Sequence, residues 1–209
     1  MGGKEPNIRW KKLNKKMKVC SIPDREAGTT QIEALIAQIK ERARNLFETR
    51  QMLCTEAVVV TLNNSLDGGL TDAQTVAMAA PFCMGLGESG CMCGALSGAV
   101  MVTGLFLGKD LPYRNREDIR DSARQLHDAF KASNGSTCCR VLSKKTIHDK
   151  EAHFKRCAAL TADATELAAR LILQKRPGLI KSLDKGFITK RESRIGGALL
   201  RLFYYFTAS

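Results

Sequence analysis

The sequence predicts an all-α fold, a compact bundle of about six helices with basic extensions at both ends. Apolar residues recur three and four positions apart along several segments, which is the spacing of one face of a helix. Two stretches have the form of a capping box, and no segment alternates apolar and polar residues as a half-buried strand does. The charged content of 26% and the apolar content of 44% are those of an ordinary globular domain.

The first two predicted helices lie between Thr30 and the turn at 67–69. Thr30 and Glu33 have the spacing of a capping box, so we expect a long helix to begin there. Its apolar stripe comprises Ile32, Leu35, Ile36, Ile39, Ala43 and Leu46. A second helix is expected from Cys54, because no turn signal precedes the valines at 58–60.

The middle of the chain carries a short helix and a central one. Thr71 and Gln74 form the second capping box, and Pro81 limits the helix that follows. The central helix is predicted at about 93–107, ended by Gly108. Because it is apolar nearly all round, we expect it to be buried.

Two further helices complete the predicted bundle. Asn115 is expected to cap the first of them, which ends at Asn134 and Gly135. The second runs from about 147 to 174 and stops before Pro177.

The net charge of +12 is concentrated at the two ends of the chain. Residues 1–18 contain seven basic residues against one acidic residue, and residues 175–209 contain eight against two. Residues 19–174 contain equal numbers of both signs. This distribution predicts a neutral domain with basic arms.

We therefore divide the chain into a basic N-terminal arm (1–27), a helical cysteine-site domain (28–175) and a basic amphipathic tail (176–209). Apolar residues recur at helical spacing over 191–206, with arginines off that stripe. Residues 178–209 are accordingly expected to attach to an anionic membrane surface or a transporter complex, or to pack on the domain. Nucleic-acid binding ranks lower, because few aromatic residues are interleaved with the basic ones.

The expected compartment is the cytoplasm, with the inner face of the membrane as an alternative site of attachment. The sequence has no apolar run near the roughly 20 residues that a membrane span needs, and no apolar stretch typical of a signal peptide. In a reducing compartment, eight cysteines indicate metal or redox chemistry more often than structural disulfides.

A glycine-rich turn that bears thiols runs into the central helix, with the sequence Gly90-Cys91-Met92-Cys93-Gly94-Ala95-Leu96-Ser97-Gly98. A cysteine at the start of a helix lies at the positive end of the helix dipole, which lowers the thiol pKa. We therefore expect a thiolate at Cys93, as a metal ligand or as a nucleophile.

Four cysteine-containing segments resemble one known family. They are Cys54-Thr55-Glu56-Ala57, the motif Cys93-Gly94-Ala95-Leu96-Ser97-Gly98, the segment that includes Cys138-Cys139-Arg140, and Cys157. Over roughly residues 30–175 the chain resembles the C_GCAxxG_C_C family of redox-active proteins and the C-terminal module of split-Soret cytochromes c.

The resemblance implies an α-helical domain with four key cysteines, Cys54, Cys93, Cys139 and Cys157, which serve redox chemistry or hold an iron–sulfur cluster. Many members lie near transporter genes in anaerobic bacteria and archaea. This chain departs from the family pattern in three ways. Cys83-Met84 stands where the family has more glycine, and both termini are extended. Cys91 and Cys138 add thiols beside two of the expected ones, and they are alternative ligands to Cys93 and Cys139.

Three kinds of site fit these cysteines, and the first is a cluster site. Four thiolates are the usual ligands of a [2Fe–2S] or [4Fe–4S] cluster, and ligands this far apart in sequence need a folded scaffold to converge. The protein would then transfer electrons to and from a redox partner protein, or sense redox state.

The second kind is a thiol–disulfide site that uses Cys91 with Cys93, or Cys138 with Cys139. The third is a structural zinc site, for which His153 is an alternative ligand because it is four residues from Cys157. His127 and His148 show no pattern of partners. Cys83 is equally well explained as a buried apolar residue or as an extra ligand.

No Ser-His-Asp set, phosphate loop, dinucleotide fingerprint or pair of carboxylates at catalytic spacing occurs in the sequence. Whether the protein is an enzyme stays open at this level. Its partners are expected to be a redox protein, a membrane surface or transporter complex, and a second copy of the chain.

Overall fold

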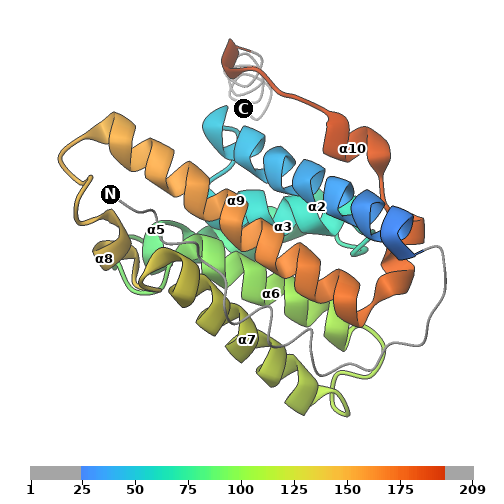
Figure 1. The fold of residues 1–209 in the computed structure, drawn as a ribbon. Helices are drawn as coiled ribbons and strands as arrows, with labels where there is room; N and C mark the ends of the chain where they lie inside the picture. Colours follow the sequence, from blue (N-terminus) through green and yellow to red (C-terminus); the bar gives the residue numbers. More distant parts are fainter. Residues whose placement is uncertain (1–24, 196–209) are drawn as a thin grey trace, which may run out of the picture. The chain divides into compact units, whose positions relative to one another are not determined.

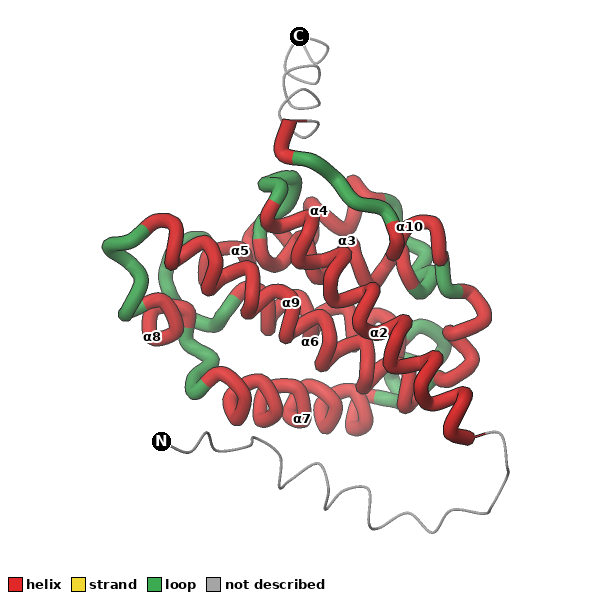
Figure 2. The backbone as a smooth tube through the Cα atoms, turned by 45° about the horizontal axis from the view of Figure 1, so that its top comes forward, coloured by secondary structure: helices red, strands yellow, loops and turns green. Residues whose placement is uncertain are grey.

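The computed structural model describes residues 25–195, with side chains from residue 30 onward. The chain divides into two units, 1–34 and 35–209, and the contacts discussed below lie within the second. The described residues form helices joined by turns and loops, with no strand among them (Figure 2). This confirms the predicted all-α fold.

Six helices of the described part have eight residues or more. In chain order the elements are α2 (Arg25–Glu48), α3 (Cys54–Ser65), α4 (Asp72–Ala79), η1 (Ala80–Phe82), α5 (Cys83–Leu86), α6 (Gly94–Gly108), α7 (Arg116–Asn134), α8 (Cys139–Ser143), α9 (Lys150–Lys175), η2 (Pro177–Ser182) and α10 (Lys185–Thr189).

Helix α6 is the central element of the bundle, because α3, α7 and α9 all pack against it (Figure 1). Its side chains are buried on several sides, among them Leu96, Val102 and Phe106. At Gly98 a Cβ atom would lie 2.9 Å from the carbonyl oxygen of Thr55, so the glycine allows α3 to approach closely. The prediction of a buried central helix is confirmed.

The long helix α9 covers α6 with a face of small side chains. Ala162, Ala164, Ala168 and Ala169 are fully buried, which lets the helix axis lie near its neighbours. Toward α2, the ammonium group of Lys40 lies 2.7 Å from the carboxylate of Glu166 on α9.

Capping interactions agree with the sequence at one predicted site. The hydroxyl of Thr71 accepts a hydrogen bond from the N–H of Gln74 at 3.3 Å, and the Gln74 side chain accepts one from the N–H of Thr71 at 2.9 Å. The other predicted box is wrong, because α2 begins at Arg25 and contains Thr30 within it.

The predicted cap at Asn115 is also wrong in its chemistry. Asn115 precedes α7, but its side-chain amide donates to the carbonyl oxygen of Leu107 at 3.2 Å and makes no capping bond. Helix α9 begins later than predicted, since the carboxylate of Asp149 accepts the N–H groups of Glu151 and Ala152. The short helices α8 and α10 were not predicted.

Several sequence predictions fall outside the described residues. Most of the basic arm (1–27), Cys20, and most of the amphipathic stripe (191–206) belong to residues 1–24 or 196–209. The boundaries assigned to the arm, domain and tail stay a prediction. Among the described helices, none is long and apolar enough to cross a membrane.

Candidate redox site at the thiol cluster

The four cysteines singled out from the sequence lie on four elements that pack around one end of α6. Cys54 is the first residue of α3, Cys93 directly precedes α6, Cys139 is the first residue of α8, and Cys157 lies on α9. Figure 1 shows that α8 lies beside α5, which precedes the motif turn. The fold thus gathers cysteines that are 18 to 103 residues apart in sequence.

The turn before Cys93 has an unusual backbone. Met84, Leu86, Glu88 and Met92 all have φ between 54° and 68°, which side-chain-bearing residues rarely adopt. Such conformations cost about 1 kcal/mol or more each and persist where the surroundings fix them. All four residues lie within ten residues of Cys93, so contacts with the surrounding structure must hold this turn in its conformation.

Glycine is required at one position of this turn. Gly85 has φ of 78°, and a Cβ atom there would lie only 2.7 Å from the Cβ of Cys139. The side chain of Cys139 therefore rests directly on the Gly85 backbone, which places α8 against the motif turn.

Two backbone hydrogen bonds fasten the motif turn to the segment that leads into α8. The N–H of Cys93 donates to the carbonyl oxygen of Thr137 at 2.7 Å, and the N–H of Arg140 donates to that of Gly90 at 3.1 Å. The Arg140 guanidinium also donates to the Ser89 carbonyl at 2.8 Å. These bonds hold Cys93 and Cys139 in fixed relative positions.

Cys93 is buried, with 4% of its surface exposed. Burial raises the pKa of its thiol to about 11, although hydrogen bonds from the N–H groups of Leu96 and Ala95 act in the opposite direction. Charge on Cys139 and Cys157 raises the pKa further, so both thiols lie within electrostatic range of Cys93. The expected thiolate at Cys93 is thus wrong for the free protein, because burial outweighs the start of the helix.

The thiol pKa values of Cys139 and Cys157 are also raised. Burial, and then the charge of Cys139, raise the pKa of the Cys157 thiol to about 11. Burial also raises the pKa of Cys139, with a contribution from its neighbour Cys138. In the free protein these three thiols are protonated at neutral pH.

The thiol pKa of Cys54 is shifted in the opposite direction. Its pKa is lowered, chiefly by a hydrogen bond with the side chain of Cys83 and also by the N–H of Met84, against the effect of burial and of charge on Cys93. The same interaction raises the pKa of Cys83, which is buried. The thiolate predicted for the motif cysteine is therefore favoured at Cys54 instead.

The additional residues named from the sequence lie around this cluster. The Nε2 atom of His153 lies 3.6 Å from the sulfur of Cys157, while its buried Nδ1 has no hydrogen-bond partner. The thiol of Cys138 donates to the carbonyl oxygen of Gly90 at 3.2 Å. Cys91 is exposed to solvent.

The described cysteines are all free thiols. Across residues 25–195, no three histidine, cysteine, aspartate or glutamate side chains lie close enough together to hold one metal ion. Within the described residues, the four thiols thus do not meet at a single point.

The comparison with protein families places this cluster in a known group. The family model described as "Putative redox-active protein (C_GCAxxG_C_C)" matches residues 52–171, more than half of the chain. The chain belongs to this family. The matched range contains all four motif cysteines and the glycine-rich turn before Cys93. No curated protein and no solved structure gives a significant match.

Sequence reasoning missed parts of the site that depend on three-dimensional contacts. The pairing of Cys54 with Cys83 has no signature in the sequence, because the two lie on different helices. The hydrogen bond from the N–H of Cys93 to the carbonyl oxygen of Thr137 joins two backbone groups, so the sequence contains no signal for it. Glycine at position 85 was visible, but only the structure shows that Cys139 is its neighbour.

Proposed function

We propose that the domain holds an iron–sulfur cluster on Cys54, Cys93, Cys139 and Cys157, and that it functions in electron transfer or redox sensing. The observation that carries this proposal is that contacts link the segments that bear the four cysteines. The sulfur of Cys54 lies against the backbone of Gly94, next to Cys93, and Cys139 lies against the motif turn at Gly85. Cys54 and Cys157 pack against the same buried cluster. Four thiolates on a rigid scaffold are the usual ligand set of such clusters.

The described side chains are not arranged to hold a single zinc ion. A zinc ion needs four sulfur atoms, each about 2.3 Å from one point. Within the described residues no three potential ligands approach in that way.

The protonation of the thiols also fits a metal group. Buried thiols such as Cys93 and Cys157 hold their protons in the free protein. A bound cation supplies the charge that stabilises a thiolate in such a place, and protons are released on binding. We therefore expect loading with metal to be favoured by rising pH.

The chain supplies more than the sulfur atoms. The N–H groups of Ala95 and Leu96 point to the sulfur of Cys93, where they would stabilise negative charge on that ligand. Cys93 itself is buried, whereas Cys54, Cys139 and Cys157 are partly exposed. When bound, the cluster supplies one-electron exchange, and hydrogen bonds and solvent exclusion of this kind tune its potential.

A thiol–disulfide function is the second candidate, and the lowered pKa of Cys54 is the observation that favours it. The Cys54 thiolate would attack a disulfide of a partner and release one partner thiolate. Cys83, after losing its proton, would then attack the Cys54 sulfur, close a Cys54–Cys83 disulfide and release the second thiolate. The partner would be reduced by two electrons and the protein oxidised.

The deciding experiment is an absorption spectrum of the full-length protein purified without oxygen, with iron, sulfide and zinc measured on the same sample. We expect a brown protein with equal iron and sulfide that dithionite bleaches. Serine variants of Cys54, Cys93, Cys139 and Cys157 should each lose iron. A Cys91→Ser variant is the matched control, because Cys91 is exposed at the same turn.

Other results would point elsewhere. A colourless, metal-free protein whose free thiol count rises on reduction would replace the cluster with disulfide exchange. Zinc without iron or sulfide would make the site structural. Iron content that falls equally in the Cys91→Ser control would show that the four motif cysteines are not its specific ligands.

A further inference from the structure

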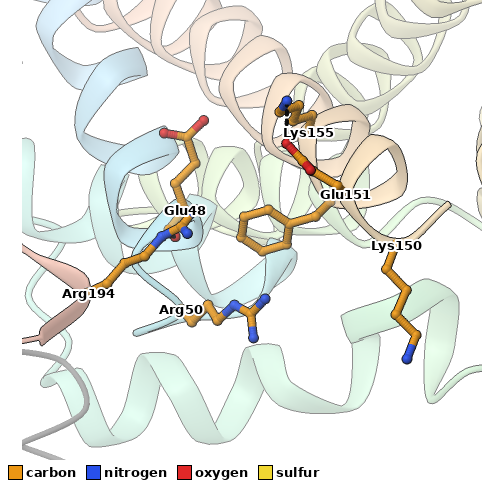
Figure 3. A pocket seen from close by; sticks show the side chains of 7 residues that line it. Glu48, Arg50, Lys150, Glu151, Lys155 and Arg194 are labelled. Atoms are coloured by element: carbon orange, nitrogen blue, oxygen red, sulfur yellow. Dashed lines mark hydrogen bonds and ion pairs between the residues drawn. The ribbon is translucent and has the colours of Figure 1, made fainter.

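A basic hollow lies at the surface beside the thiol cluster, with a volume of about 550 Å³. Its lining comes from the end of α2, the start of α9 and the segment after α10 (Figure 3). The residues are Glu48, Arg50, Lys150, Glu151, Phe154, Lys155 and Arg194. The volume is within the range of roughly 300–1,000 Å³ that small-molecule sites occupy.

An aromatic ring with two planar cations lines this basic hollow. Phe154 is half-buried and stacks on Phe47, with ring centroids 5.0 Å apart, so its position is fixed by the core. The guanidinium carbon of Arg50 lies 5.3 Å from the Phe154 ring centroid, and that of Arg194 lies 6.0 Å from it. Phenyl and guanidinium groups both stack against flat rings.

The hollow carries an excess of positive charge. Four of its side chains are cationic and two are carboxylates, and one carboxylate, that of Glu151, is paired with Lys155 at 2.6 Å. The N-terminus of α9 is not the source of this charge, because Asp149 already accepts its N–H groups. The positive charge comes from side chains of three separate segments, which Figure 3 shows gathered around one space.

The hollow is also adjacent to the motif thiols. Phe154 packs against the same buried cluster as Cys54 and Cys157, a cluster formed by Leu46, Phe47, Ala57 and Ala158. Phe154 precedes Cys157 by three residues, so both lie on one side of α9. The hollow and two of the motif cysteines therefore border the same buried cluster.

We propose that the basic hollow binds a small molecule with a flat ring and phosphate groups, of the size of a mononucleotide. Lys150 and Arg194 would bind the phosphate groups, because cationic side chains make charge-assisted hydrogen bonds to phosphate. The guanidinium of Arg50, which lies over the Phe154 ring, would receive the flat ring of the ligand on its outer side. This inference does not depend on which group the cysteines hold.

The test is isothermal titration calorimetry of the full-length protein with ADP, with FMN and with inorganic pyrophosphate. We expect at least one nucleotide to bind, and to bind about tenfold or more tightly than pyrophosphate, because only the nucleotide has a ring to stack. The cysteine sites need not be loaded for this measurement.

Two variants locate the binding. A Lys150→Gln, Arg194→Gln double variant should weaken nucleotide binding by about tenfold or more, because it removes two charge-assisted contacts. Phe154→Leu should weaken nucleotide binding while leaving pyrophosphate binding unchanged. A Lys131→Gln, Lys181→Gln double variant is the matched control, since both lysines are exposed and lie outside the hollow. Circular dichroism on each variant verifies folding.

The proposal is overturned if neither nucleotide binds the intact protein, or if pyrophosphate binds as tightly as both nucleotides. It is also overturned if the hollow variant and the control lose affinity equally, because the effect would then be one of net charge alone. Each of these results leaves the iron and sulfide measurements at the thiols unaffected, so the two proposals fail separately.

Discussion

Gly94 and Cys54 are in such close contact that a Cβ atom at position 94 would lie 2.6 Å from the sulfur of Cys54. The same Cβ atom would lie 2.6 Å from the hydroxyl oxygen of Thr55 and 2.8 Å from the carbonyl oxygen of Phe82. Glycine is therefore needed at position 94 because any side chain there would clash with its neighbours, and not because of the helix conformation. The first turn of α3 and the end of η1 pack directly on the backbone beside Cys93.

We expect Gly94→Ala to destabilise the protein by several kcal/mol or to abolish loading of the site, because three neighbours would have to move. Gly104→Ala is the matched control on the same helix. A Cβ at Gly104 meets nothing within 4 Å, and the exchange should stabilise by about 0.5–1 kcal/mol. Urea unfolding of both variants measures the difference, and equal stabilities would contradict the close-contact argument.

The stability of the metal-free protein should fall between about pH 8.5 and pH 11. Cys93 has a pKa of about 11 when folded and about 8.5 when unfolded, so the unfolded state loses its proton first. Stability from this group is complete below the unfolded pKa and is lost as pH rises toward the folded value. The loss is about 3 kcal/mol, from a difference of about 2.5 pKa units.

The measurement is urea unfolding at pH 8 and at pH 10.5, with Cys93→Ser and Cys91→Ser compared. Serine at position 93 should reduce the dependence on pH, whereas serine at the exposed position 91 should leave it unchanged. The same slope in all three proteins would show that burial of Cys93 is not its cause.

The motif thiols should react with iodoacetamide over different ranges of pH. The pKa of Cys54 is lowered and that of Cys139 is raised, so alkylation of Cys54 should reach half of its plateau at lower pH. Mass spectrometry of each site, normalised to its own plateau rate, removes the effect of access. If Cys54 and Cys139 reached half of their plateau rates at the same pH, or in the reverse order, the hydrogen bond with Cys83 would not lower the pKa of Cys54.

Arg42 fastens the segment after α10 to α2. Its side chain is 2% exposed, lies 4.7 Å from the ring centroid of Phe187 and 3.2 Å from the carboxylate of Glu192, and donates to the carbonyl oxygen of Lys190. Arg194, which lines the basic hollow, follows directly in this segment. Arg42 therefore helps to hold one wall of the hollow in place.

Arg42→Met should cost about 1–3 kcal/mol and increase hydrogen exchange in residues 188–195, because a buried charged contact and a stacked guanidinium are lost. Arg44→Met is the control two residues away, since Arg44 forms only a half-exposed pair with Glu41. If both variants exchange hydrogen at the same rate in 188–195, Arg42 does not anchor the segment.

The helical fold and the positions of most helices could be predicted from the sequence alone. Local signals decide these features, such as the reciprocal bonds of Thr71 and Gln74 and the apolar surface of α6. The prediction failed at Thr30, where the helix continues through a capping pattern, because the same residues are also tolerated within a helix. The sequence also identified the motif cysteines, through a spacing that is specific to one family.

The pKa values of these thiols and the contacts between them depend on the tertiary structure. The start of α6 favours a thiolate at Cys93, yet burial of this side chain has the larger effect on its pKa. Cys83 and Cys54 lie 29 residues apart, and their contact depends on where η1 meets α3. The basic hollow likewise combines positions near 50, 150 and 194. Desolvation and contacts between distant segments are properties of packing, so a linear pattern of residues does not contain them.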